Sequence, residues 1–354
     1  MKALYFGTYD RAAPRNTQVI SCLRAAGVDV AERHREVWGR QNWSLGMRQL
    51  ARVLRAERSL ARAEERDADV VLVGYPGHFD LPAARRIARG RPIVFNPLVS
   101  LHDTLVADRK RFRPSSPAAK VVEIVDRIAF RRADLVVADT DAHARFFRDR
   151  FELPAERVAV ALLGAEERLF RPGWQPPEPF HVLFVGKLIP LHGLETILAA
   201  AELLPEIPFR VVGDGQLAPL LGRRPANVEH VEWIEYTELP AAYQRAGCAL
   251  GIFGTGEKAA RVIPNKAFQA LACARPLITA DTPAARELLA DGRDALLVPP
   301  GDPQALAAAI DRLASDPALT ERLARSGRAT FVARASEEVL GRQWRALLEH
   351  VLAR

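Results

Sequence analysis

The sequence has no apolar run long enough for a membrane-spanning helix, and it has only three cysteines in 354 residues. The chain begins MKALYFGTYD, which lacks the long apolar core of a secretion signal. Cys22, Cys248 and Cys273 stand singly without CxxC spacing, so neither a zinc site nor a disulfide framework is predicted. We therefore expect a cytoplasmic protein with reduced, buried cysteines.

A dinucleotide fingerprint and an acidic surplus are also missing. GxGxxG follows none of the predicted strands, which leaves a hydride-transfer function poorly supported. Lys and Arg number 50 against 43 Asp and Glu, giving a net charge of +7. That balance fits an anionic partner, or equally a compositional bias toward Arg and Ala. We expect no nucleic-acid partner.

Short apolar strand patterns alternate with helical patterns along the whole chain, which predicts an α/β protein with mostly parallel sheets. A proline-rich stretch at residues 172–179 interrupts the alternation and predicts a linker. The chain is longer than the length that a single hydrophobic core usually supports. We therefore expect two Rossmann-like domains, residues 1–172 and 178–335. The last helical pattern, residues 336–354, is expected to pack back on the first domain.

In the second domain, glycines and polar residues follow predicted strands, where parallel sheets bind ligands. The candidates are Gly186, Lys187, His192, Gly213, Gly215, Arg261, Asn265, Lys266 and Glu287. Glycine allows close backbone approach and helix starts offer N–H groups, so this pattern predicts a cradle for a diphosphate. The alternative is that these residues have no binding role. Lys187 would then be a surface lysine and His192 part of a turn, Gly213 would form a simple turn, and Glu287 would be a solvated helix residue.

Taken in order, these stretches resemble the second domain of retaining GT-B glycosyltransferases of family 4, also called group 1. The most specific piece is LLADGRDALLVPPGDPQALAAAIDRLASDPALTERLA, joined by FVGKLIPLHGLETIL, VVGDGQL and ADLVVADTDAHARFF. The resemblance covers nearly the whole chain. It implies a GT-B fold with an interdomain cleft, and transfer of a sugar from a nucleotide-diphosphate sugar, of UDP or GDP type, to an acceptor hydroxyl.

The resemblance implies no metal and no further cofactor, because basic side chains and helix N-termini take up the charge of the leaving diphosphate. The resemblance implies catalytic roles for His102, Lys187 and Lys266. Lys187 matches the first basic position of the family, and His192 stands where the second is usually lysine, so the charge there depends on pH.

The segment ARVIPNKAFQALACARP, residues 260–276, corresponds to the Glu-x7-Glu segment of the family but lacks both carboxylates. Arg261 stands at the donor-sugar position, Gln269 at the ribose position and Ala274 in place of a glycine. Pro264-Asn265-Lys266 matches a variant in which the lysine turns toward the donor phosphates. Two explanations stay open: a working enzyme whose leaving phosphate takes the acceptor proton, or a homologue that binds sugar nucleotides or membrane surfaces without catalysis.

In the first domain, FGTYDRAAPRN, GYPGHFD and NPLVSLHDTL each follow a predicted strand. The candidate acceptor-binding residues are Gly7, Arg15, Asn16, His78 and Asp103. Arg15 and Asn16 suit either an acceptor phosphate at a helix start or a simple cap. His102-Asp103 looks like the His-Asp segment of the family.

An Arg-rich helix is predicted over residues 45–66. It either presses on anionic lipid, as for a lipid-linked acceptor at the inner face of the membrane, or buries an apolar stripe under a solvated face. A sugar or a small molecule is an equally open acceptor, so the product is a glycan, a glycolipid or a glycosylated metabolite.

Overall fold

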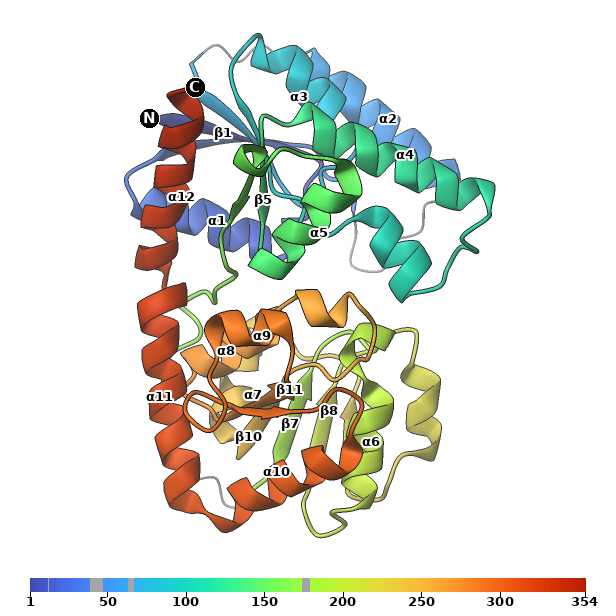
Figure 1. Cartoon of the computed structure of the whole chain (residues 1–354), viewed down its shortest axis with the longest axis vertical. Helices are drawn as coiled ribbons and strands as arrows, with labels where there is room; N and C mark the ends of the chain where they lie inside the picture. The colour runs from blue at the N-terminus through green and yellow to red at the C-terminus, as the bar shows by residue number, and fades with distance from the viewer. Residues whose placement is uncertain (12, 39–46, 63–66, 174–178) are drawn as a thin grey trace. The chain divides into compact units, whose positions relative to one another are not determined.

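The computed structural model describes residues 1–11, 13–38, 47–62, 67–173 and 179–354. These residues form two compact units (Figure 1). Unit 1 comprises Met1–Leu162 and Glu337–Arg354, and unit 2 comprises Leu163–Ser336. The boundary thus falls at Leu162, earlier than the expected residue 172. Most of the expected linker, and both ends of the expected 45–66 helix, lie outside the described residues.

Unit 1 contains a six-stranded parallel sheet in the order β2-β1-β3-β4-β5-β6. Its strands are β1 (Lys2–Gly7), β2 (Asp29–His34), β3 (Val70–Val73), β4 (Ile93–Phe95), β5 (Leu135–Ala138) and β6 (Val158–Val160). β3, β4 and β5 are buried at every position. Their sequences are uniformly apolar because both faces of a parallel sheet are covered by helices.

The helices of unit 1 are α1 (Pro14–Ala25), α2 (Met47–Ala61), α3 (Leu81–Ala88), α4 (Pro117–Arg132), α5 (Asp141–Phe151) and α12 (Glu337–Leu352). α2, α3 and α4 lie side by side, and α2 to α5 bury apolar residues in one core with the sheet. α1 and α12 pack against each other (Figure 1). Their backbones come close because a methyl group at Gly341 would lie 2.5 Å from the carbonyl oxygen of Cys22.

Unit 2 contains a second six-stranded parallel sheet, in the order β12-β11-β10-β7-β8-β9. Its strands are β7 (Val182–Val185), β8 (Phe209–Val212), β9 (Val228–Val231), β10 (Cys248–Leu250), β11 (Leu277–Ala280) and β12 (Leu296–Val298). Its α-helices are α6 (Leu194–Glu202), α7 (Leu239–Arg245), α8 (Asn265–Ala272), α9 (Pro283–Leu288), α10 (Pro303–Ser315) and α11 (Pro317–Ala335). α10 packs on α6, and α11 packs on α8.

Each sheet has one point where the strand order reverses. In unit 1 it lies between β1 and β3, and in unit 2 between β7 and β10. Loops that leave adjacent strands at such a point turn to opposite faces of the sheet and leave a crevice between them. The loops after β1 and β3, and those after β7 and β10, are therefore the places to look for ligand-binding groups.

Arg15 joins three parts of unit 1 and is only 1% exposed. Its Nε donates to Oδ1 of Asn96 at 3.0 Å, and its other nitrogens donate to the carbonyl oxygens of Leu162 at 2.9 Å and Ala161 at 3.1 Å. The guanidinium also lies 5.3 Å from the ring centre of Trp344 on α12. Burial lowers the pKa of Arg15. We therefore assign Arg15 a role in the fold, and its expected role as an acceptor-phosphate ligand stays a prediction.

Replacing Arg15 tests this assignment. Arg15→Met leaves Asn96 and two buried carbonyl groups without their donor, so we expect a loss of about 3 kcal/mol or more. For a unit of this size that loss lowers the melting temperature by roughly 6 to 12 °C. Thermal unfolding measures it, with exposed Arg223→Met as the matched control. Equal melting temperatures for the two variants would refute the structural role.

Candidate functional site

Three loops of unit 2 meet beside the reversal point of its sheet. The loop after β7 includes the short helix Pro190–His192, and the loop after β10 runs beside it. The Phe253 N–H donates to the His192 carbonyl at 3.1 Å, which joins these two loops. The Leu188 N–H donates to the Asp214 carbonyl at 3.0 Å and so joins the loop after β8. The candidate residues on these loops are thus held on a rigid frame.

Lys266 lies in the first turn of α8 and carries a buried, unpaired amino group. Its side chain is 5% exposed, and its Nζ has no hydrogen-bond partner among the residues that the structure describes. Nζ lies 3.9 Å from the ring centre of Phe184 on β7, a cation–π contact that offsets part of the lost hydration. Burial nevertheless lowers the pKa of Lys266 well below its usual value.

Gly186 allows the lysine to reach this position. Its φ is +151°, and a methyl group there would lie 2.7 Å from Nζ of Lys266 and 3.2 Å from Cε1 of His192. Any side chain at Gly186 would therefore displace one of them. Gly213 and Gly215 allow main chains to come close together. Gly213 packs against the main chain of Gly186, and Gly215 packs against that of Leu188. The three expected glycines thus line one site.

His192 is buried, and its Nδ1–H donates to the carbonyl oxygen of Lys187 at short range. Since a carbonyl can only accept, this bond places a proton on Nδ1. The ring lies against Phe184, with 5.7 Å between ring centres. The side chain of Lys187 itself is exposed. His192 and Lys266 are therefore close neighbours around Gly186 and Phe184, as the order of motifs suggested.

The segment that lacks its carboxylates is also part of this wall. Pro264 is the N-cap residue, so α8 begins at Asn265. Gln269 is buried and accepts a hydrogen bond from Tyr243 Oη at 3.1 Å. Arg261 pairs with Glu257, Nη1 to Oε2 at 3.2 Å, although Glu257 is 91% exposed. An acid thus does reach the arginine from four residues upstream.

Glu287 lies elsewhere, on the short helix α9 after β11. Its side chain is half-buried, and its carbonyl accepts a hydrogen bond from Arg334 at 3.3 Å. α9 begins with Thr282, whose side chain caps the backbone N–H of Ala285. The donor-binding role of Glu287 stays a prediction.

In unit 1, the corresponding loops are joined by Asp80. Its carboxylate accepts from the Thr8 N–H at 2.7 Å and from the Thr8 hydroxyl at 2.9 Å, and Trp38 Nε1 donates to that hydroxyl oxygen at 3.2 Å. Gly7 makes this possible, because a methyl group there would lie 2.1 Å from Oδ2 of Asp80. Gly7 is therefore required by the loop geometry, and an acceptor contact at it stays a prediction.

Glu57 on α2 places a second carboxyl group beside Asp80. Both of its carboxyl oxygens are buried. Burial and the neighbouring Asp80 raise the pKa of Glu57 far above the usual value of a glutamate. At neutral pH Glu57 is therefore a neutral acid that can donate as well as accept hydrogen bonds.

The other acceptor candidates of unit 1 are buried. Asn16 is fully buried, with its amide bonded to the main chain of Asp10 and Tyr75 and to the Tyr5 hydroxyl. His78 is also buried, and its Nε2 bonds to the carbonyl of Val99 at 3.0 Å. These contacts give Asn16 and His78 structural roles, and their acceptor-binding roles stay predictions.

Asp126 organises the segment that carries His102. Its carboxylate accepts from the Ser100 hydroxyl at 2.7 Å and from the backbone N–H groups of Leu101 and His102 at 2.9 and 2.8 Å. His102 is half-buried, and Asp103 is buried at the start of the helix Asp103–Asp108. The structure thus fixes the backbone of the His-Asp segment, and the roles of both side chains stay predictions.

Sequence reasoning missed Phe184, Asp80, Glu57 and Asp126. Phe184 lies within an ordinary apolar strand, so nothing in the sequence marks it as a partner of Lys266. Asp80 was within a quoted loop and directly precedes a helix, a signal that favours a cap. The structure instead gives its side chain no capping bond and directs it to Thr8.

The described residues contain no group of three or more His, Cys, Asp and Glu side chains that could hold a metal ion. None of their helices has the length and apolar character needed to cross a membrane.

Two family models match the chain in succession. "Glycosyl transferase 4-like domain" matches residues 8–164, and "Glycosyl transferases group 1" matches residues 179–316. Alpha-D-kanosaminyltransferase of Streptomyces kanamyceticus is 27% identical over 279 residues, which are 69% of this chain and 66% of that protein. A D-inositol 3-phosphate glycosyltransferase of Nocardioides sp. is 28% identical over 248 residues, 59% of this chain and 51% of that protein. The chain therefore spans about half to two thirds of the length of these relatives.

Solved structures resemble the chain over almost its whole length. Sucrose-phosphate synthase from Thermosynechococcus elongatus has a TM-score of 0.78 at 18% identity and covers 99% of both chains. HepE from Anabaena, solved in complex with UDP-glucose, has a TM-score of 0.71 at 18% identity and covers 99% of this chain and 100% of that one. At this identity the likeness shows the fold.

The buried cation of Lys266 predicts a pH-dependent stability cost. Its lowered pKa means that the unfolded chain binds more protons between that pKa and about 10.4, so the cost is largest at lower pH and disappears as pH rises. We expect Lys266→Met to stabilise the protein at pH 7 by on the order of 1 to 2 kcal/mol, and less near pH 10. Thermal unfolding at both pH values measures this. Lys187→Met, which removes an exposed lysine, should show no such trend.

Glu57 predicts the opposite pH trend. Its raised pKa means that the folded state keeps a proton that the unfolded chain releases above about pH 4.3, so wild-type stability falls as pH rises. Glu57→Gln removes this loss, and its stability advantage over wild type should grow from pH 5 to pH 8. Glu123→Gln is the control, because Arg150 lowers the pKa of Glu123, so its carboxylate is ionised in both states and the stability difference should not change between pH 5 and pH 8. A constant difference between Glu57→Gln and wild type would contradict the buried neutral acid.

Proposed function

This chain belongs to the group 1 glycosyltransferases and has their GT-B fold of two Rossmann-like domains, and we propose that it transfers a sugar from a nucleotide-diphosphate sugar to an acceptor hydroxyl with retention of configuration. Unit 2 binds the donor, and unit 1 provides the acceptor groups. The product is a glycan, a glycolipid or a glycosylated metabolite, made in the cytoplasm or at the inner face of the membrane.

The observation that carries the proposal is the buried, unpaired Nζ of Lys266 at the start of α8. A cation held away from water without a partner costs stability, and such a cost is typical of a site that awaits an anion. A helix N-terminus adds a positive dipole end in the same place. Gly186 supplies the adjacent open backbone. This is a site for the diphosphate of a sugar nucleotide.

The proposed reaction breaks the bond between the anomeric carbon and the diphosphate oxygen. The acceptor oxygen bonds to the same face of the sugar, and its proton passes to the departing phosphate oxygen, so no protein carboxylate is needed as base. Lys266, and His192 when its Nε2 also carries a proton, stabilise the negative charge that develops on the leaving group. Lys187 adds charge at the rim. We propose that these groups replace a metal ion in that task.

The remaining contacts orient the donor. Asn265 Oδ1 is buried without a hydrogen-bond partner in the described part of the chain, so it can accept a hydrogen bond from a donor hydroxyl. Gln269 takes the ribose position and Arg261 the sugar position, where its pair with Glu257 brings back a carboxylate. For unit 1, we propose that His102 acts on the reacting sugar and that Asp103 and Gly7 serve the acceptor.

UDP is the first nucleotide to test, because HepE of Anabaena was solved with UDP-glucose. We expect UDP to raise the melting temperature of the wild type, and Lys266→Ala to lower UDP affinity by roughly tenfold to a hundredfold, as for a lost charged hydrogen bond. Because the diphosphate raises the pKa of Lys266, binding should take up protons. Calorimetry in buffers of different ionisation enthalpy measures this uptake, which Lys266→Ala should lose and Lys187→Ala should keep.

Transfer from UDP- and GDP-sugars, with and without a chelator, tests the activity itself. Donor binding without hydrolysis or transfer to any acceptor would favour a non-catalytic homologue. Failure of every nucleotide to shift the melting temperature would refute the donor site. Unchanged turnover in both Lys266→Ala and Arg261→Ala would refute the roles given to these two residues.

A further inference from the structure

One helix of unit 1 exposes an apolar stripe. On α4, Val121, Ile124 and Ile128 are 58%, 56% and 41% exposed. Their spacing of three and four residues places them on one face of the helix. The opposite face is buried through Ala119, Val122, Asp126, Ala129 and Phe130. α4 is therefore apolar on two sides, and only one of them is covered by unit 1.

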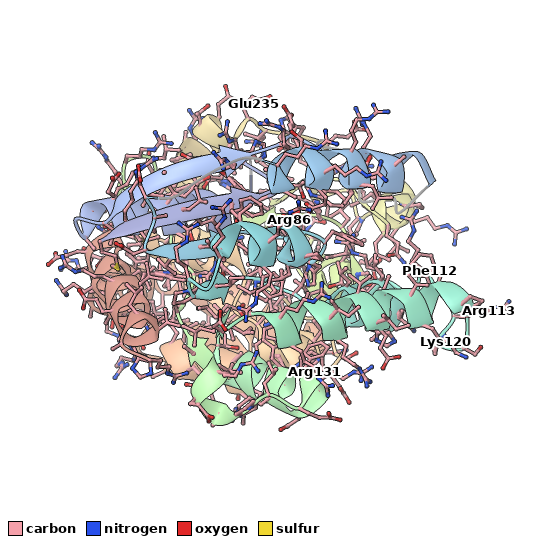
Figure 2. The ribbon with its side chains drawn as sticks, turned by 90° about the horizontal axis from the view of Figure 1, so that it is seen from above. Arg86, Phe112, Arg113, Lys120, Arg131 and Glu235 are labelled. Carbon is pink, nitrogen blue, oxygen red and sulfur yellow. The ribbon has the colours of Figure 1, made fainter. Side chains whose placement is uncertain are left out.

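Basic residues flank this stripe. The exposed basic side chains of α4 are Lys120, Arg127, Arg131 and Arg132. Its acids are Asp126, which is buried, and Glu123, which pairs with Arg150 and Arg127. Arg131 pairs with Glu152, so a positive excess remains. Figure 2 shows Phe112, Arg113 and Lys120 at one end of α4, Arg131 toward the other end, and Arg86 on the neighbouring α3.

The Arg-rich helix, for which lipid contact was one of two alternatives, is built differently. In α2, Val53, Ala56 and Leu60 are buried, and they pack into the cores of unit 1. The packed alternative is therefore correct for this part of α2. Leu54 is exposed on it. Among the described residues of unit 1, the exposed large apolar residues that share one helix face lie on α4.

We propose that the α4 face, made of Val121, Ile124 and Ile128 with Lys120, Arg127, Arg131 and Arg132, binds the surface of an anionic lipid bilayer. An amphipathic helix with an apolar stripe between basic residues lies in the interface plane, with its basic side chains at the lipid headgroups. The sign of the charge decides against a second copy of the chain, because two α4 faces would bring arginine against arginine. This binding is separate from the proposed glycosyl transfer and needs no donor.

The test uses the full chain and vesicles of phosphatidylcholine alone or mixed with phosphatidylglycerol. Wild type should sediment with the anionic vesicles only, and less so at high salt. A triple variant, Val121→Ser with Ile124→Ser and Ile128→Ser, should lower the partition coefficient about tenfold or more. Lys120→Gln with Arg132→Gln should lower it roughly twentyfold, since each headgroup-level charge contributes about fivefold.

Matched controls come from unit 2. Leu203→Ser with Val332→Ser removes similarly exposed apolar residues, and Arg312→Gln with Arg322→Gln removes exposed charges, so both pairs should bind like wild type. Unchanged thermal unfolding shows that the variants are folded. The proposal is overturned if wild type ignores anionic vesicles or if the triple variant binds as well as wild type. It is also overturned if wild type is a dimer in solution and the triple variant is a monomer, because the α4 face then joins two copies of the chain.

Discussion

The amino group of Lys266, buried and without a hydrogen-bond partner among the described residues, is the constraint on which the site of unit 2 depends. Burial disfavours its charged form and so lowers its pKa. The ring of Phe184 from β7 lies below it, Gly186 leaves room beside it, and α8 sets its backbone. The loops after β7, β8 and β10 are tied by main-chain hydrogen bonds rather than by mobile side chains. The stability lost by burying Lys266 is thus offset by the ordered loops around it.

Unit 1 uses buried charge in a different way. Asp80 and Asp126 are both fully buried, and each is satisfied by hydroxyl and main-chain N–H donors of a neighbouring loop. Arg15 does the same with carbonyl groups. These three side chains hold loops at the carboxyl ends of strands. The neutral acid Glu57 stands apart from them, since its neighbour Asp80 is already committed to Thr8.

The strand and helix alternation predicted both sheets, because uniform apolar runs and helical periods are local signals. Lys266, His192 and Gly186 were also predicted, since their motifs lie on loops whose register a single strand sets. The structural contacts of Arg15, Asn16 and His78 could not be predicted because their partners are far away in sequence: Asn96, Tyr75 and Val99. No local pattern reveals that a polar residue following a strand is already bonded inside the fold.

The placement of α12 makes unit 1 discontinuous along the chain, with β1 and α12 in the same unit (Figure 1). Unit 2 is then an insertion into unit 1, entered at Leu163 and left at Ser336. One continuous stretch of sequence therefore forms the whole half of the chain that makes unit 2. That half is open to exchange as a block between related proteins, whereas any recombination within unit 1 must keep Arg15 and Trp344 matched across more than three hundred residues of sequence.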